Sequence, residues 1–250
     1  MKRRAETATT MKLDTRTFPD IDGLSRGALE ELLRVLEDAV AERGRFAVAL
    51  SGGRTPAKLY ALWAQQRYRV QTPWDRVHLF WGDERYVPHD DPQSNYRMTR
   101  ETLIAQVPIP VDNVHPMPTE LPQPERAAEV YEKELREFFG SAPPAFDVQL
   151  LGIGVEGHTA SLFPGSPVLE ETRRWVAAVE VPANPARRLT LTPAVLNSGR
   201  NTFFLVAGTD KREIVKALRT QPETTPSRYP AGRIGLAGRT LWFLDQAAAD

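Results

Sequence analysis

Short apolar runs alternate with amphipathic stretches along this chain, and the alternation limits its fold more than any other feature. The apolar runs have strand length, whereas the stretches between them repeat apolar side chains at helical spacing. Strands separated by helices of ten or more residues are typical of a mainly parallel sheet covered on both faces. We predict an α/β fold with strands at 45–51, 77–84, 146–154, 174–181, 189–192, 201–208 and 240–245, and helices at 24–44, 55–66, 96–106, 124–140 and 210–220.

The 250 residues show neither an internal repeat nor a long low-complexity linker, so we predict a single domain over residues 1–250. Residues 1–11 or so are basic and precede any apolar run, and we expect them to be frayed. The Pro-rich stretch 220–233 is predicted to be a surface loop.

Charge and composition argue against several functional classes. Lys+Arg and Asp+Glu both total 32, so no net charge favours a nucleic acid or an anionic membrane as partner. The absence of cysteine excludes disulfides, thiol nucleophiles and Cys-ligated zinc. No apolar run approaches the roughly 20 residues that span a bilayer, and the N-terminus lacks the apolar core of a secretory signal. We expect a cytoplasmic protein with no nucleic-acid or membrane partner; protein partners are not predicted.

In open parallel sheets, ligands bind beyond the carboxyl ends of the strands. Four stretches meet this condition here, and they contain most of the chain's candidate functional residues. They are 51–55, 83–85, 152–161 and 208–211.

The third stretch carries Gly152, Gly154 and Gly157 in the spacing of a dinucleotide-binding loop. Such a loop must lead into a full helix whose N-terminus faces the pyrophosphate. Here Pro164 follows within two turns, so a nicotinamide site is disfavoured. Glu180 nevertheless follows the glycines at about the sequence separation expected of a ribose-binding carboxylate.

His158 follows these glycines, and it alone among four histidines is framed by glycines at a predicted strand end. A neutral imidazole there can take a proton from water near pH 7. Glu156, two residues earlier, can orient the ring or set its tautomer. The alternative is that His158 only hydrogen-bonds its own loop.

The stretch "SGGRTP" places Ser51, Gly52, Gly53 and Thr55 between a predicted strand and a helix. Backbone N–H groups at a helix N-terminus form a natural anion site, to which Thr55 adds a hydroxyl. The alternative is a plain tight turn. A nucleoside triphosphate is disfavoured because no Gly-Lys-Ser/Thr follows.

"GDER" ends another strand with Asp83, suited to sugar hydroxyls, and Arg85, suited to a phosphate. Both charges can equally be solvated. Asn95 is a further candidate for binding hydroxyls, with an N-cap role for Ser94 or Asn95 as the alternative.

Other cations stand near the last strand ends. Lys211 falls in the first turn of a predicted helix, where a cation is unfavourable unless an anion binds there. Arg187 and Arg188 precede the strand-like "LTLT". Together, the candidates describe a sugar-phosphate site with acid–base chemistry and no cofactor.

At these residues the chain resembles the 6-phosphogluconolactonase family. The motifs are "ALSGGRTP", "FWGDERYVPHDDPQSNYRM", "LGIGVEGHTASLFPGSP", "RLTLTPAVLN" and "FLVAGTDK", in the family's order. Glu156 stands where an aspartate is also common in that family. The resemblance implies a three-layer α/β fold shared with glucosamine-6-phosphate deaminase.

The resemblance also implies hydrolysis of 6-phospho-D-glucono-1,5-lactone in the oxidative pentose phosphate pathway. His158 would activate the water that attacks C1, without a metal, and return the proton to the ring oxygen.

Two other functions remain as alternatives. A deaminase of the same fold carries a glutamate five residues after its histidine, where this chain has Phe163. A non-catalytic sugar-phosphate sensor fused to a DNA-binding module needs an N-terminal helix-turn-helix. This chain instead has one long predicted helix before its first predicted strand at Phe46.

Overall fold

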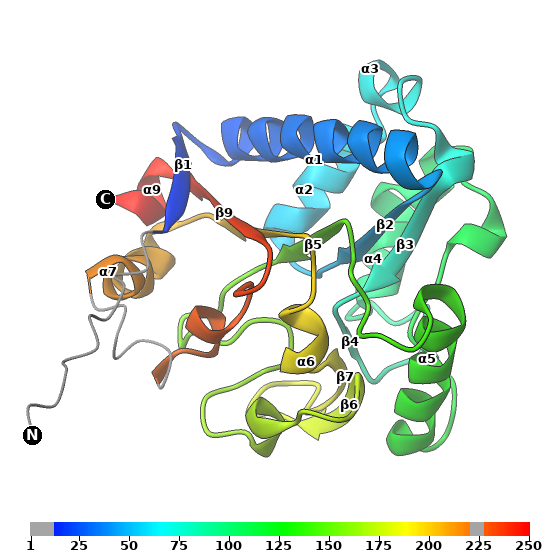
Figure 1. Ribbon diagram of the computed structural model, residues 1–250. Helices are drawn as coiled ribbons and strands as arrows, with labels where there is room; N and C mark the ends of the chain where they lie inside the picture. Colours follow the sequence, from blue (N-terminus) through cyan, green and yellow to red (C-terminus); the bar gives the residue numbers. More distant parts are fainter. Residues whose placement is uncertain (1–12, 221–227) are drawn as a thin grey trace, which may run out of the picture.

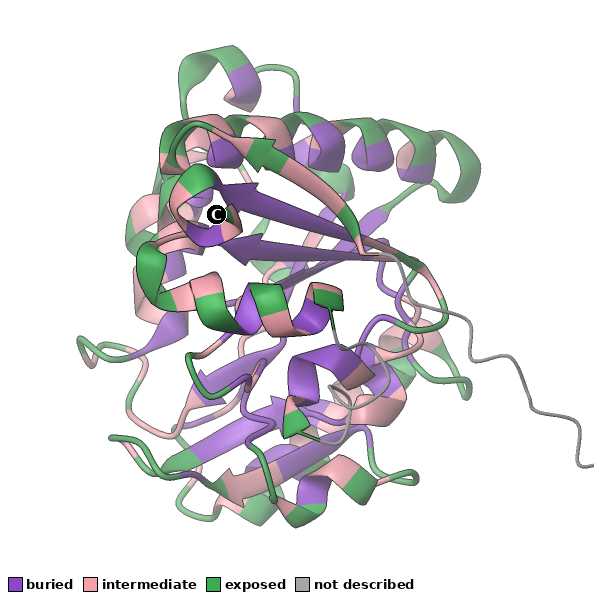
Figure 2. Cartoon of the chain, turned by 90° about the vertical axis from the view of Figure 1, so that its left-hand side faces the viewer, coloured by how far each residue is buried: buried purple, intermediate pink, exposed green. Residues whose placement is uncertain are grey.

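The computed structural model describes residues 13–220 and 228–250, so the predicted fraying of residues 1–11 lies outside the described residues. Within them, a six-stranded sheet follows the order β1-β9-β8-β5-β2-β3 (Figure 1), and every neighbouring pair is parallel. The predicted apolar runs supply five of its strands, whose side chains are largely buried (Figure 2). The predicted α/β class is confirmed. The strands are β1 (Asp14–Phe18), β2 (Phe46–Leu50), β3 (Val77–Trp81), β5 (Val148–Leu151), β8 (Asn201–Val206) and β9 (Arg239–Asp245).

Helices lie on both sides of this sheet: Figure 1 shows α1 and α2 above it and α6 and α7 below it. The longest, α1, begins after Asp20, whose side chain accepts from the backbone N–H of Gly23, and ends at Gly44 with φ of 71°. None of the described helices is both long and apolar enough to span a membrane. The helices are α1 (Ile21–Arg43), α2 (Arg54–Trp63), α3 (Gln66–Arg69), α4 (Asn95–Thr102), α5 (Pro124–Phe139), α6 (Pro193–Leu196), α7 (Arg212–Thr220) and α9 (Gln246–Ala249).

Short 3-10 turns connect several of these elements. They are η1 (Trp74–Arg76), η2 (Ile104–Gln106), η3 (Val111–Asn113), η4 (Pro167–Glu170), η5 (Thr209–Lys211) and η6 (Pro230–Arg233).

Strand β1 corrects the prediction that the first strand begins at Phe46. It pairs with β9 at the edge of the sheet and is only partly buried. An edge strand has one neighbour and needs no continuous apolar run. The polar sequence "DTRTF" therefore lacked the signal that identified the other strands.

A second sheet of three antiparallel strands was not predicted as a separate unit. It consists of β4 (Asp83–Arg85), β7 (Arg187–Leu191) and β6 (Val176–Glu180), in that order. The strands at 174–181 and 189–192 were predicted, but local sequence patterns do not reveal which strands pair.

The prediction of a surface loop at 220–233 is wrong for its end. Residues 221–227 lie outside the described residues, but Pro230, Ala231 and Gly232 are buried in η6. The N–H of Ala231 donates to the carbonyl of Gly157 at 3.0 Å, so this turn packs against the glycine loop after β5.

Glu31 joins α1 to the edge of the sheet. Its carboxylate accepts from Arg34, Arg239 and Arg16 at 2.8, 2.5 and 3.0 Å. Burial alone would raise the pKa of Glu31, but these three hydrogen bonds lower it to about 2.

We expect Glu31→Gln to lower the free energy of unfolding at pH 7 by about 1–2 kcal/mol, because the partly exposed guanidiniums limit the value of each pair. A folded-state pKa below the ordinary 4.5 means that the carboxylate stabilises the fold above that pH and ceases to do so as pH falls toward 2. Thermal unfolding at several pH values checks this. A difference in Tm between wild type and Glu31→Gln that stays constant from pH 7 to 3 would contradict it.

Candidate active site

The four predicted strand ends meet at one edge of the central sheet. Strands β8, β5, β2 and β3 are consecutive in the sheet and parallel, so the loops that follow them are neighbours. A cavity of about 360 Å³ opens there. The predicted site residues that line it are Ser51, Gly52, Asp83, Arg85, Asn95, His158, Arg188 and Lys211.

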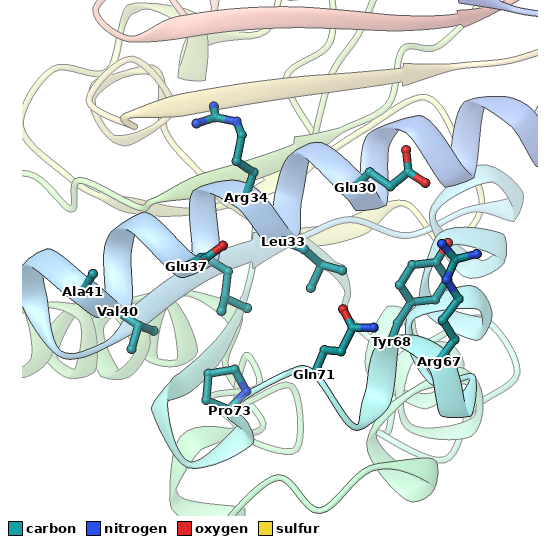
Figure 3. Close-up of a pocket in the computed structure, with 11 residues that line it drawn as sticks. Glu30, Leu33, Arg34, Glu37, Val40, Ala41, Arg67, Tyr68, Gln71 and Pro73 are labelled. Carbon is teal, nitrogen blue, oxygen red and sulfur yellow. The ribbon is translucent and has the colours of Figure 1, made fainter.

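A larger cavity, of about 780 Å³, lies between α1 and the chain around and after α3 (Figure 3). Its walls include the carboxylates of Glu30 and Glu37 beside the apolar side chains of Leu33 and Val40. None of the described residues that line it is a histidine or follows a strand end. We therefore place the candidate site in the smaller cavity.

His158 lines that cavity from the loop after β5. Its ring stacks on Phe163, with centroids 4.0 Å apart and planes inclined by 13°. The buried Nδ1 lies 3.1 Å from Oε1 of Glu156, but the carboxylate is off the line of a well-formed hydrogen bond. Because Nδ1 is buried beside Glu156, Nε2 is the ring nitrogen that can face the cavity.

The surroundings of His158 keep its imidazole neutral near pH 7. Burial lowers its pKa below the ordinary 6.5, and this effect outweighs the opposite influence of the Glu156 and Asp83 carboxylates. A neutral imidazole can accept a proton, which is what a general base must do.

The glycines of the loop after β5 leave the space that His158 and Tyr229 occupy. A side chain at Gly154 would place its Cβ 2.1 Å from Nδ1 of His158, and a Cβ at Gly157, where φ is 86°, would meet Tyr229 at 2.5 Å. Residues 152–166 contain no helix. The crossover helix of a dinucleotide site is therefore missing, in agreement with the prediction that disfavoured a nicotinamide.

Asp83 and Asn95 form a buried polar network beside the histidine. Oδ2 of Asp83 accepts from the Ser161 hydroxyl at 2.7 Å, and its backbone carbonyl accepts from Nδ2 of Asn95 at 2.9 Å. The N-cap of α4 is Ser94 rather than Asn95, and Asn95 lines the cavity. Oγ of Ser51 and Oδ1 of Asn95 are buried, with no hydrogen-bond partner among the described residues.

Two arginines are cross-strand partners in the second sheet. Arg85 in β4 is paired in register with Arg188 in β7, and like charges directly opposite are destabilising. Each donates to a backbone carbonyl, and neither makes an ion pair with a described carboxylate. Burial and Arg85 both lower the pKa of Arg188. An anion bound between them would relieve this repulsion.

Lys211 adds a third cation, which forms an ion pair with Asp210 at 3.1 Å. It is the last residue of η5 rather than part of the first turn of α7, where the sequence placed it. The 3-10 turn begins after Gly208, whose N–H is held by the Asp245 carboxylate, and so brings Lys211 to the cavity.

Some sequence candidates do not line the cavity. Gly53 precedes α2 with φ of 102°, Thr55 lies in the first turn of that helix, and Glu156 lies beside Nδ1 of the imidazole without lining the cavity. Arg187 is exposed, lies 3.9 Å from Glu180 and lines a different cavity. Successive strand residues point to opposite faces, which separates Arg187 from Arg188.

Ser161 and Phe163 line the cavity but were not among the predicted site residues. Ser161 lies at the end of the stretch 152–161 that the strand-end rule selected, which was a usable signal. The sequence distinguishes Phe163 only as the residue at the position of the deaminase glutamate. Among the described residues, no three or more His, Asp or Glu side chains gather so as to hold a metal ion.

Comparison with known proteins places this chain in a family. The pattern described as glucosamine-6-phosphate isomerases/6-phosphogluconolactonase matches residues 19–242. A 6-phosphogluconolactonase from Synechocystis is 46% identical over 215 residues, 85% of this chain and 87% of that protein. The solved 6-phosphogluconolactonase from Trypanosoma brucei superposes with a TM-score of 0.84 at 30% identity, over 95% of this chain and 98% of that one. A monomeric glucosamine-6-phosphate deaminase shares the fold, with a TM-score of 0.77 at 21% identity over 95% of this chain and 99% of that one. The chain therefore belongs to the glucosamine-6-phosphate isomerase/6-phosphogluconolactonase family.

Proposed function

We propose that this protein hydrolyses 6-phospho-D-glucono-1,5-lactone to 6-phospho-D-gluconate, the lactone-opening step of the oxidative pentose phosphate pathway. The observation that carries the proposal is a neutral, half-buried histidine in the same cavity as two guanidiniums without ion-pair partners among the described residues. Relatives named 6-phosphogluconolactonase support it at 46% and 41% identity.

His158 would act first as a general base. The Glu156 carboxylate beside Nδ1 favours the tautomer with its proton on that nitrogen, which leaves the lone pair of Nε2 toward the cavity. Nε2 takes a proton from water as the water oxygen bonds to C1 of the lactone. The bond from C1 to the ring oxygen then breaks, and the imidazolium returns the proton to that oxygen.

The remaining polar groups would hold the substrate. Arg85, Arg188 and Lys211 supply positive charge for the phosphate, which carries about −1.5 to −2 at pH 7. The buried hydroxyl of Ser51 can donate to the phosphate or to a sugar oxygen, and the buried Oδ1 of Asn95 can accept from a sugar hydroxyl. Asp83, already held by Ser161, is a further acceptor for a hydroxyl and steadies the imidazolium.

The rival deaminase chemistry lacks a required group in this cavity. Its pattern needs a glutamate to support the histidine during ring opening, and the matching residue here, Phe163, stacks flat on the imidazole. An apolar ring cannot carry or relay a proton. Lactone opening needs only an activated water and a returned proton.

We expect the purified protein to open the lactone much faster than its spontaneous hydrolysis, while glucosamine 6-phosphate releases no ammonia above background. Both assays are run on one preparation. Ammonia release at a rate comparable to lactone opening would contradict the assignment. Binding of 6-phosphogluconate without turnover of either substrate would instead favour a sensor.

A further inference from the structure

Glu84 is a buried carboxylate at the site that the proposed chemistry leaves without a role. It lies in β4 between Asp83 and Arg85, and strand alternation points its side chain away from the cavity that these two neighbours line. The residue is 1% exposed. A carboxylate taken out of water is costly unless several donors compensate it.

Four donors surround this carboxylate. Oε1 accepts from the backbone N–H of Arg85 at 2.7 Å and of Asn95 at 2.8 Å. Oε2 accepts from the N–H of Tyr96 at 2.7 Å and from the hydroxyl of Ser94 at 3.3 Å. Burial raises the pKa of Glu84 to about 7, and the three backbone hydrogen bonds act against that rise.

These contacts connect β4 to the start of α4. The first N–H groups of a helix have no partner within it, and Ser94 caps only that of Arg97. Glu84 supplies the partner for the first two N–H groups of the helix, those of Asn95 and Tyr96, and its negative charge suits the positive end of the helix.

The connection fixes side chains that face the cavity. Asn95 is held by its own N–H to Glu84 and by its Nδ2 to the carbonyl of Asp83. Its Oδ1 packs so closely over Gly52 that a Cβ there would lie 1.8 Å away. Moving the start of α4 would therefore displace Asn95 from the loop after β2 and from β4 together.

We propose that Glu84 is a positioning residue for substrate binding: it ties β4 to the N-terminus of α4 and so sets Arg85 and Asn95 at the spacing that the sugar phosphate requires. This inference rests on the proposed function. Glu84 contacts neither His158 nor the cavity. Its removal acts through Arg85 and Asn95, and therefore on substrate binding rather than on proton transfer.

Glu84→Gln tests this, with Glu101→Gln as the matched control. The control makes the same change in α4, the helix that Glu84 contacts, at an exposed residue whose partner is Arg97. An amide has one acceptor oxygen and no charge, so it cannot serve three backbone N–H groups. For Glu84→Gln we expect KM for the phosphorylated lactone to rise about tenfold or more while kcat per folded molecule changes less than about threefold. The control should match the wild type.

A second measurement follows the geometry without activity. Amide hydrogen exchange at Asn95 and Tyr96 should accelerate at least about tenfold in Glu84→Gln relative to Glu101→Gln. Unchanged KM and unchanged exchange would overturn the proposal. A fall in kcat per folded molecule with KM unchanged would also overturn it, because Glu84 would then act on the chemical step and not on binding.

Two other outcomes would still test the proposal. If Glu84→Gln does not fold, Glu84→Asp replaces it, since the charge is kept while the carboxylate is withdrawn by one methylene; a raised KM supports the proposal and an unchanged KM overturns it. If the wild type does not open the lactone, the proposed function fails. Glu84 is then judged by the exchange at Asn95 and Tyr96 and by affinity for inorganic phosphate, where no change in either overturns the proposal.

Discussion

His158→Asn is expected to lower kcat for 6-phosphogluconolactone by about 10²–10⁴-fold, the usual contribution of a general base. Asparagine approaches the size of the ring and can hydrogen-bond, but it cannot accept a proton from water. Initial rates on protein shown to be folded by circular dichroism measure the effect. His89→Asn is the matched control, because His89 lies outside the cavity and bonds to the carbonyl of Met117.

The pH dependence gives this prediction a second readout. Burial lowers the pKa of His158 from 6.5, and the neutral form is the active one, so wild-type kcat at saturating lactone should fall only as pH drops below that ordinary value. The residual activity of His158→Asn should lose this acid limb. A folded variant with near-normal kcat, or with the acid limb intact, would show that another group is the base.

Arg188→Ala is expected to raise KM for the phosphorylated lactone by about 10–100-fold, because a hydrogen bond to a charged group is worth about 1.5–3 kcal/mol. Arg188 is 7% exposed and faces Arg85 across the ladder, so its charge acts in a partly desolvated site. The effect should appear in KM rather than kcat if the phosphate contact is the same in the ground and transition states.

Arg187→Ala is the control for that experiment, since it removes a neighbouring guanidinium that points to the opposite, exposed face. Arg188→Ala should also weaken the preference for the phosphorylated lactone over the unphosphorylated one, whereas Arg187→Ala should not. Equal effects of the two substitutions would mean that a general charge effect, and not a phosphate contact, is responsible.

Most of the central sheet and the larger helices could be predicted because each leaves a local signal. Strand β2 is buried throughout and therefore apolar throughout, and α1 carries both a helical stripe and a closing glycine, Gly44. Strand β1 left no such signal because its side chains are only partly buried or exposed. The second sheet and the buried turn at Pro230 depend on pairing and packing between segments distant in sequence.

For the candidate site, too, the local signals were predictable and the features that depend on packing were not. His158, Asp83 and Lys211 could be predicted to share one cavity, because parallel strand topology alone places the segments after their strands side by side. The sequence could not choose between Arg187 and Arg188, because the choice depends on strand register, which fixes which side chain faces inward. The role of Glu84 could not be predicted either. Its partners at the start of α4 lie about ten residues later in the chain, and the sequence does not show how that helix packs against β4.

The most direct test of a lactonase with a phosphate-binding site is the initial rate of ring opening for 6-phosphoglucono-1,5-lactone and for unphosphorylated glucono-1,5-lactone. Proton release is followed at near-neutral pH, with the spontaneous opening of each lactone subtracted. The wild type is predicted to open the phosphorylated lactone far faster than the background and the unphosphorylated one poorly. Equal turnover of the two lactones, or no acceleration of either, would contradict the account.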